Sequence, residues 1–366
     1  MKAIIIDNGG LMRTGEGKYA CHYQTGMFGV ELQKLGCNVT YLQIYTDTDT
    51  SINTCVLNDH GINVVAIKRQ KSKILTYLKA YSKAFRVMFS SDLIYIYWPT
   101  SFKYVSLFAL LFKKKYGLYV RGEKDQDGVI NRFIIKHASF VATVSDHFTH
   151  KIQNYGVKNT FTIKPMVDLM VDDIIVDRKL VKKEKYTLLF LGRVEHDKGI
   201  RELLDAFILL RAEYNVHLSI VGDGSAIPYV RQFIDKNQVH EHITVRGALN
   251  TKDEIKNAFT DSDIYVLPTY HEGFPRTLYE AMAYSIPIVT TFVGGIPAML
   301  RDKVHCRSIE VKSVTSIKDV VSEMLSSYES LSLLTDNSKR LICSVLDPNR
   351  PSHAASVFHQ LSNLYE

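Results

Sequence analysis

The chain has 366 residues, of which 46% are hydrophobic and 23% charged, a composition typical of a globular protein with one large or two average domains. The longest apolar stretch, residues 104–112, is too short to cross a bilayer, and residues 3–6 are too short for a signal-peptide core, so we expect a cytoplasmic protein. The net charge of +7 is uneven, because residues 1–172 carry +9 and the remainder −2, which suggests that the first half alone meets an anionic surface.

The first half of the sequence alternates short apolar runs with helical segments. Residues 3–7 predict a strand, which leads into a glycine-rich loop at 8–17 and then into a helix that ends at Gly36. Further strands are predicted at 38–45, 93–99, 117–123 and 140–145. This alternation of strand and helix indicates a parallel sheet with right-handed crossovers.

The same alternation starts again near residue 186, after a charged segment at 168–185 that we interpret as a linker. The predicted strands are 186–194, 216–224, 242–247, 263–268 and 286–291, and helical segments separate them. A second parallel sheet is therefore expected. Pro348 and Pro351 interrupt the chain before a last helix.

Two glutamates, Glu272 and Glu280, lie eight residues apart just after a predicted strand. Gly273 permits a tight turn and Pro275 suits the first turn of a helix, so Glu272 is expected in the loop and Glu280 in the second helical turn. Ligands bind at this edge of parallel sheets, where helix N-termini attract anions. Carboxylates beside an anion suit sugar and ribose hydroxyls; the alternative is a strand, turn and helix with two solvated acids.

Three further loops of this kind follow predicted strands. Arg193 and Lys198 lie in the first, and a planar guanidinium beside an ammonium group suits a diphosphate. The others contain a GDG turn at 222–224 and a GG pair at 294–295. Each is weak alone, but four loops at one sheet edge, with two acids and two bases, predict a single binding site.

Residues 186–300 resemble the donor domain of retaining glycosyltransferases of family four, which have the GT-B fold. The matching motifs, in the family's order and spacing, are GRVEHDKG (192–199), GDG (222–224), VRGAL (245–249), SDIYVLPTYHEGFPRTLYEAMAYSIP (262–287) and GG (294–295). The resemblance implies an α/β protein of two Rossmann-like domains that face each other across a cleft. Residues 1–170 would bind the acceptor, 171–348 would bind the donor, and the helix at 349–366 would return to the first domain.

The resemblance also implies roles for individual residues. Arg193 and Lys198 would hold the donor diphosphate, Glu272 would grip the sugar near the reacting carbon, and these three would be the catalytic residues. Glu280 would accept hydrogen bonds from the ribose. The other donor-binding residues implied are Gly192, Gly222, Gly224, Ala248, Leu249, Gly273, Phe274, Pro275, Thr277 and Leu278.

On the acceptor side the resemblance is limited to an outline. Gly9 and Gly10 would let the first domain approach the phosphates. Trp98 would stack on an acceptor sugar or, alternatively, pack within its loop. Many relatives have a histidine at the end of the fourth strand, where this chain reads VRGE, so Arg121 or Glu123 would take over part of its role.

The implied reaction is transfer of a hexosyl group from a nucleotide-diphosphate sugar to a hydroxyl of a glycan or lipid-linked acceptor, with retention and without a cofactor or metal. The setting would be polysaccharide, lipopolysaccharide or glycolipid biosynthesis. Two alternatives remain open: a nucleotide-sugar epimerase or phosphorylase on the same fold, and a non-catalytic nucleotide-binding subunit of a glycan assembly complex.

Asp-x-Asp triplets at 47–49, 125–127 and 261–263 are of the kind that binds Mg²⁺ or Mn²⁺ in glycosyltransferases of the other major fold. Acidic pairs are, however, usual in polar loops, and we expect no metal site. The five scattered cysteines, without a CxxC motif, indicate thiols rather than disulfides.

Residues 68–89 contain seven basic residues and no acid, interleaved with aliphatic and aromatic side chains, and Lys113, Lys114 and Lys115 follow further on. A basic amphipathic segment predicts docking on anionic lipid at the inner face of the membrane. The alternative is an ordinary helix whose apolar face belongs to the core and whose lysines are solvated. Nucleic-acid binding is not expected, because no recognised motif accompanies the charge.

Overall fold

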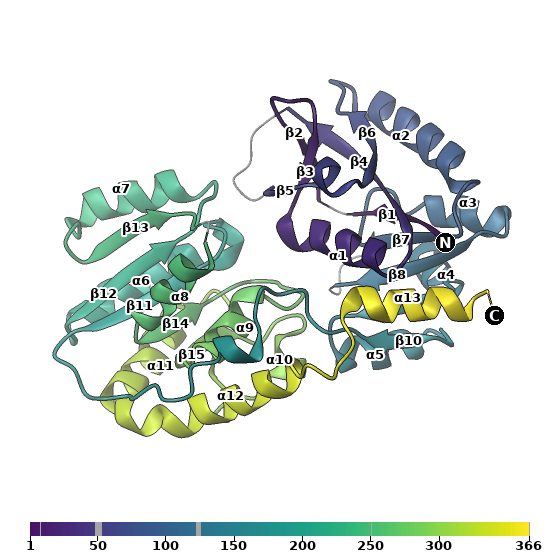
Figure 1. The fold of residues 1–366 in the computed structure, drawn as a ribbon. Helices are drawn as coiled ribbons and strands as arrows, with labels where there is room; N and C mark the ends of the chain where they lie inside the picture. Colours follow the sequence, from purple (N-terminus) through teal and green to yellow (C-terminus); the bar gives the residue numbers. More distant parts are fainter. Residues whose placement is uncertain (8, 48–52, 122–125, 250, 366) are drawn as a thin grey trace. The chain divides into compact units, whose positions relative to one another are not determined.

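The structure, a computed structural model, describes residues 1–7, 9–47, 53–121, 126–249 and 251–365. Its contacts divide the chain into two compact units (Figure 1). The first contains residues 1–166 and 349–366, and the second contains residues 167–348. The division therefore falls between residues 166 and 167, whereas the sequence analysis placed it between 170 and 171.

The first unit is built on a ten-stranded sheet whose central part is parallel. In spatial order its strands are β10 (Thr160–Thr162), β9 (Phe140–Thr143), β8 (Lys115–Val120), β7 (Leu93–Trp98), β1 (Lys2–Ile6), β4 (Asn38–Thr46), β2 (Leu11–Arg13), β3 (Tyr19–Cys21) and β5 (Cys55–Val56), and β6 (Asn63–Lys68) pairs with β4. Among these pairings, the two that involve β3, with β2 and with β5, are antiparallel, and the others are parallel. The sequence predicted β1, β4, β7, β8 and β9 but not β2, β3, β5, β6 or β10.

Helices cover both faces of the first sheet. They are α1 (Tyr23–Lys34), α2 (Lys73–Met88), α3 (Val105–Leu111), α4 (Val129–Lys136), α5 (Asp146–Gln153) and α13 (His353–Asn363). One hydrophobic cluster joins the sheet to α1 and α13, which lie side by side in Figure 1. Another cluster joins the opposite face to α2, α3 and α4. The central strand β7 is consequently buried along its whole length.

The second unit is built on a six-stranded sheet in which every pairing is parallel. Its strands, in spatial order, are β13 (Ile243–Gly247), β12 (Val216–Val221), β11 (Tyr186–Leu191), β14 (Ile264–Leu267), β15 (Ile288–Thr291) and β16 (Arg307–Ile309). By chain order within the sheet this is 3-2-1-4-5-6, the doubly wound Rossmann arrangement. The strand order reverses between β11 and β14, and doubly wound sheets bind ligands at this point.

The helices of the second unit pack around one continuous hydrophobic core. They are α6 (Ile200–Arg211), α7 (Ile227–Asn237), α8 (Lys252–Thr260), α9 (Arg276–Ala283), α10 (Ile296–Met299), α11 (Val314–Ser326) and α12 (Ser332–Val345). Helix α6 packs against α7 and α11, and α9 packs against α12. In the described parts of the chain, no helix has the length and apolar character needed to cross a bilayer.

Candidate active site

The loops that follow β11 and β14 lie on either side of the point where the strand order reverses. The first contains a short 3-10 helix, His196–Lys198, and then begins α6. The second contains Glu272 and leads into α9. Because the two strands are parallel neighbours, both loops leave the same edge of the sheet. The fold therefore brings together the two motifs that the sequence analysis identified separately.

Glycine lets the backbones of these loops approach closely. Gly199 has φ +70°, and a Cβ atom there would lie 2.1 Å from the carbonyl oxygen of Pro268. Gly294 has φ +56°, and its Cβ would lie 1.7 Å from the carbonyl oxygen of Glu272. The N–H of Gly295 donates to the carbonyl of Gly273 over 2.7 Å. Any side chain at Gly199 or Gly294 would therefore push the loops apart.

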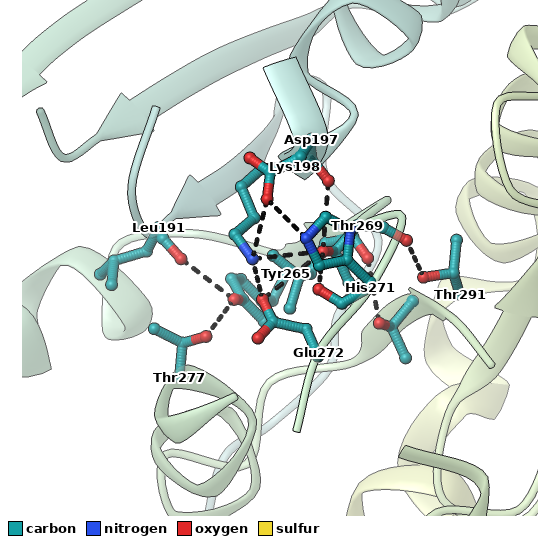
Figure 2. Close-up of polar contacts among 11 residues, drawn as sticks. Leu191, Asp197, Lys198, Tyr265, Thr269, His271, Glu272, Thr277 and Thr291 are labelled. Atoms are coloured by element: carbon teal, nitrogen blue, oxygen red, sulfur yellow. Dashed lines mark hydrogen bonds and ion pairs between the residues drawn. The ribbon is translucent and has the colours of Figure 1, made fainter. Parts of the chain in front are cut away.

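The ammonium group of Lys198 lies at the centre of the site and is buried (Figure 2). It forms an ion pair with Glu272. The hydroxyl of Thr269 lies 3.5 Å from the Lys198 Nζ, and an Asp197 carboxylate oxygen lies 3.8 Å from it. His271 is exposed, with its Nε2 3.3 Å from Asp197. Glu272 is thus the counter-ion of Lys198.

The sequence analysis predicted Lys198 and Glu272 but not Thr269 or Asp197. Thr269 is fully buried, two residues after β14. A small hydroxyl residue at the carboxyl end of a buried strand was the available signal for this position. Asp197 directly precedes Lys198 in the GRVEHDKG motif, and this adjacency was the available signal for it.

Arg193 differs from Lys198 in its surroundings. Its side chain is exposed, and within the described contacts the guanidinium has no hydrogen-bond or ion-pair partner. The loop that carries it is nevertheless fixed: the Glu195 carboxylate accepts from the N–H and hydroxyl of Ser225, and the Val194 N–H donates to the Asp223 carbonyl over 2.9 Å. These Ser225 hydrogen bonds lower the pKa of Glu195. Arg193 is therefore an exposed cation on a fixed loop.

Glu280 lies on the second turn of α9, as expected, and is half-buried. Burial raises the pKa of this carboxyl group to about 7, and Arg276 opposes the shift. Pro275 is the residue before α9 rather than its first residue. On the same helix, the Thr277 hydroxyl accepts a 2.6 Å hydrogen bond from Tyr265, which also contacts the Leu191 carbonyl (Figure 2). These contacts tie the start of α9 to β11.

The remaining predicted donor-site residues fall into two groups. Gly192, Gly222, Gly224, Ala248, Leu249, Gly273 and Phe274 lie in loops or at strand ends along the carboxyl edge of the second sheet. Leu278 and Pro275 are buried, and the Leu278 side chain belongs to the hydrophobic core. Because α9 turns the Leu278 side chain into the core, the predicted contribution of Leu278 to donor binding would come from its backbone.

In the first unit, the predicted acceptor residues are not equally placed. Gly9 and Gly10 are exposed after β1, and the Gly9 N–H donates to Asp7 over 2.9 Å. Arg121 lies against the rings of Tyr97 and Tyr119, at 5.6 and 5.8 Å from their centroids. Glu123 lies outside the described residues.

For Trp98, the structure favours packing over stacking. This residue is fully buried in the hydrophobic cluster under α2 and α3, so it is not available to stack on an acceptor sugar. The physical reason is that β7 lies in the middle of the sheet and has helices on both faces. Its continuous run of large apolar residues is typical of such a strand.

No group of three or more metal-ligating side chains of His, Cys, Asp or Glu occurs among the described residues. Two of the three Asp-x-Asp triplets, 47–49 and 125–127, include positions outside the described residues. In the third, Asp263 is buried and accepts from Lys183 and from the Thr187 N–H. This aspartate therefore has a structural role. All five cysteines are free thiols.

Comparison with known proteins agrees with this geometry. Residues 172–341 match the family model "Glycosyl transferases group 1". The uncharacterized glycosyltransferase MJ1607 of Methanocaldococcus jannaschii is 28% identical over 160 residues, 44% of this chain and 41% of that protein. The capsular polysaccharide biosynthesis glycosyltransferase CapM of Staphylococcus aureus is 27% identical over 180 residues, 44% of this chain and 46% of that protein. The chain thus aligns with less than half the length of either relative.

Among solved structures, Alr3699/HepE of Anabaena in complex with UDP is similar with a TM-score of 0.70 and 14% sequence identity. The similarity covers 100% of this chain and 99% of that one. At this identity the likeness shows the fold. The chain therefore has the GT-B fold, and its residues 172–341 match the glycosyl transferases group 1 family model.

Proposed function

We propose that this chain is a retaining glycosyltransferase that moves a hexosyl group from a nucleotide-diphosphate sugar to a hydroxyl of a glycan or lipid-linked acceptor. The observation that carries the proposal is the Lys198–Glu272 pair at the carboxyl edge of the second sheet, where Lys198 shares its loop with Arg193. A cation and a carboxylate at one point suit the two halves of such a donor: its phosphates and its sugar hydroxyls.

Donor binding would rearrange this pair. A diphosphate competes with Glu272 for the Lys198 ammonium group and draws the exposed guanidinium of Arg193 to its other oxygens. Glu272, released from Lys198, can then accept a hydrogen bond from a hydroxyl of the sugar. The ribose hydroxyls would reach Glu280 on α9, whose burial favours a partner that donates hydrogen bonds.

The same cations would act on the chemical step. As the bond between the anomeric carbon and the diphosphate oxygen breaks, negative charge grows on the departing nucleoside diphosphate. Arg193 and Lys198 stabilise that charge more than they stabilise the ground state, which lowers the barrier. Because the protein supplies two cations, the proposal includes no metal ion. Retention, with a diphosphate oxygen taking the acceptor proton, follows from the family resemblance.

The names of the relatives guide the choice of substrates. HepE was solved with UDP and with UDP-glucose, and CapM is named for capsular polysaccharide biosynthesis. UDP-sugars are therefore the first donors to test, and the setting that we propose is polysaccharide or glycolipid synthesis, lipopolysaccharide included. The location that we propose is the cytoplasm, at the inner face of the membrane.

The function is tested by screening nucleotide sugars for a rise in melting temperature, followed by product analysis with the donor that binds. A transferase releases one nucleoside diphosphate for each glycoside formed, with the anomeric configuration of the donor, and EDTA leaves the rate unchanged. A need for inorganic phosphate would indicate a phosphorylase, and conversion of the sugar without an acceptor would indicate an epimerase. Binding without any turnover would indicate a non-catalytic subunit.

A further inference from the structure

The outer surface of α2 and α3 carries many apolar side chains that face solvent. We call it the α2–α3 surface. Its exposed apolar residues are Ile74, Leu75, Leu78, Phe85, Phe89, Phe108, Leu111 and Phe112. Ile74 and Leu111 are 73% and 72% exposed, so these side chains project into solvent. Such a continuous exposed patch calls for a partner or a surface that covers it.

The two helices form one surface because aromatic rings join them. The ring of Phe85 on α2 lies 6.0 Å from that of Phe108 and 5.3 Å from that of Phe112, measured between centroids. Phe89 lies 5.0 Å from Phe85 and 5.1 Å from Phe112. Helices α2 and α3 lie side by side in Figure 1.

These apolar residues do not belong to the hydrophobic core. Helix α2 faces the sheet with Thr76, Ala80, Ala84 and Met88, which recur every four residues and are buried. Ile74 and Leu78 lie on a different side of the helix. The alternative interpretation of this segment, in which its apolar face is core, is therefore wrong for the most exposed residues.

The charges around the α2–α3 surface are positive. Lys79, Lys83 and Arg86 are exposed along α2, and Lys113 is exposed just after α3. In the sequence between residues 69 and 114 the only acid is Asp92. Its carboxylate accepts a 2.7 Å hydrogen bond from the Lys2 N–H. An apolar centre with a cationic border complements a bilayer that offers acyl chains and anionic headgroups together.

We propose that the α2–α3 surface docks the first unit on an anionic membrane. Ile74, Leu78 and Leu111 enter the boundary between headgroups and acyl chains, and the basic residues lie against lipid phosphates. This inference assigns a surface of the protein to the membrane location given in the proposed function. It rests on the proposed function only for the statement that the inner face of the membrane is bound. The contacts that carry it lie entirely within the first unit.

The test is flotation of the full chain with vesicles of phosphatidylcholine, with and without phosphatidylglycerol, at low and high salt. We expect binding only to the anionic vesicles, and weaker binding as salt rises. The triple substitution Lys79→Gln, Lys83→Gln, Arg86→Gln should weaken binding about a hundredfold at low salt. The triple substitution Ile74→Ser, Leu78→Ser, Leu111→Ser should weaken it about tenfold.

Matched controls come from exposed apolar residues of the second unit. Val176→Ser, Leu209→Ser and Leu333→Ser replace side chains that are 65%, 48% and 66% exposed and should leave flotation unchanged. Melting temperatures check that every variant is folded. The inference is overturned if the wild type ignores anionic vesicles at low salt, if it floats equally with neutral vesicles, or if the Ile74, Leu78 and Leu111 variant binds as the wild type does.

Sugar transfer to a water-soluble acceptor is measured in parallel, because it separates this inference from the proposed function. Vesicle binding without any transfer would support the docking surface and remove the transferase. Transfer without vesicle binding would support the transferase and overturn the docking surface. Capture of a protein partner by the α2–α3 surface, with no response to lipid, would assign the surface to a protein interface and overturn membrane docking.

Discussion

The two units share a parallel sheet covered by helices but place their charges differently. In the second unit, charged groups converge at the carboxyl edge of the sheet, and the central cation, Lys198, is buried against Glu272. In the first unit, cations lie on the outside of α2 beside apolar side chains. The comparison teaches that one architecture can bury charge at a sheet edge or expose it on a helix. The uses that we propose for the two arrangements, catalysis and membrane docking, can be tested separately.

The largest effect on this comparison is expected from Gly294→Ala. The new Cβ would lie 1.7 Å from the Glu272 carbonyl oxygen, so the loops that hold the inward charges must separate. We expect a loss of at least about 3 kcal/mol in the free energy of unfolding and no measurable nucleotide binding. Urea unfolding and titration with UDP measure both.

Gly61→Ala is the control for backbone strain alone. Gly61 has φ +69°, but its nearest neighbour would be 3.8 Å from a Cβ. The Gly61→Ala variant should lose about 1–2 kcal/mol in the free energy of unfolding and keep nucleotide binding. Equal effects of the two substitutions would contradict the steric argument for Gly294.

Lys198→Met comes next, because it removes the buried cation while retaining an unbranched chain of similar length. Turnover should fall about 10²- to 10³-fold, as charge on the leaving group loses its nearest partner. Lys252→Met, which breaks an ion pair with Asp173 in the same unit, should leave turnover unchanged. Steady-state kinetics with the donor found by screening gives the comparison, and similar losses in both variants would indicate a general effect on folding.

Arg193→Ala should have a smaller effect. The guanidinium is exposed, and nothing in the described contacts binds it in the free protein, so the melting temperature should not change. Loss of one charge-assisted contact costs about 1.5–3 kcal/mol, or about tenfold to a hundredfold in kcat/KM. Arg211→Ala, at the opposite end of α6, is the matched control. A lower melting temperature with normal turnover would assign Arg193 a structural role instead.

The smallest effect is a pH dependence. Glu280 has a pKa raised from 4.5 to about 7 by burial, so the folded state binds a proton that the unfolded state has released. Stability from this group is therefore present below pH 4.5 and declines as pH rises toward 7. Glu280→Gln removes this dependence. The melting temperature of this variant relative to the wild type should rise between pH 4.5 and 7 and then level off. A difference that stays constant with pH would contradict the raised pKa of Glu280.

Much of the second unit could be predicted from sequence, because each motif follows an apolar run and parallel strands bring such motifs to one edge. The pairing of Lys198 with Glu272 could not, since it depends on how two loops from different strands face each other. In the first unit, the end of β7 left both stacking and packing open for Trp98, whereas the continuous apolar run of this strand indicates burial on both faces.

The α2–α3 surface shows a different limit of sequence reasoning. The basic segment was evident in the sequence, but its periodicity alone did not say which apolar residues the core would take. Only the packing of Ala80 and Ala84 against the sheet leaves Ile74 and Leu78 in solvent. The contribution of α3 depends on ring contacts between helices separated by a strand, and local sequence carries no signal for those.

Helix α13 has a consequence for how the protein is made. It supplies Ala354, Val357 and Leu361 to the core of the first unit, and His353 forms a 2.6 Å hydrogen bond with Tyr95 there. During translation these residues emerge after the entire second unit. The α1 side of the first sheet therefore stays open while the ribosome completes the intervening residues, and this part of the nascent polypeptide needs protection from aggregation until α13 emerges.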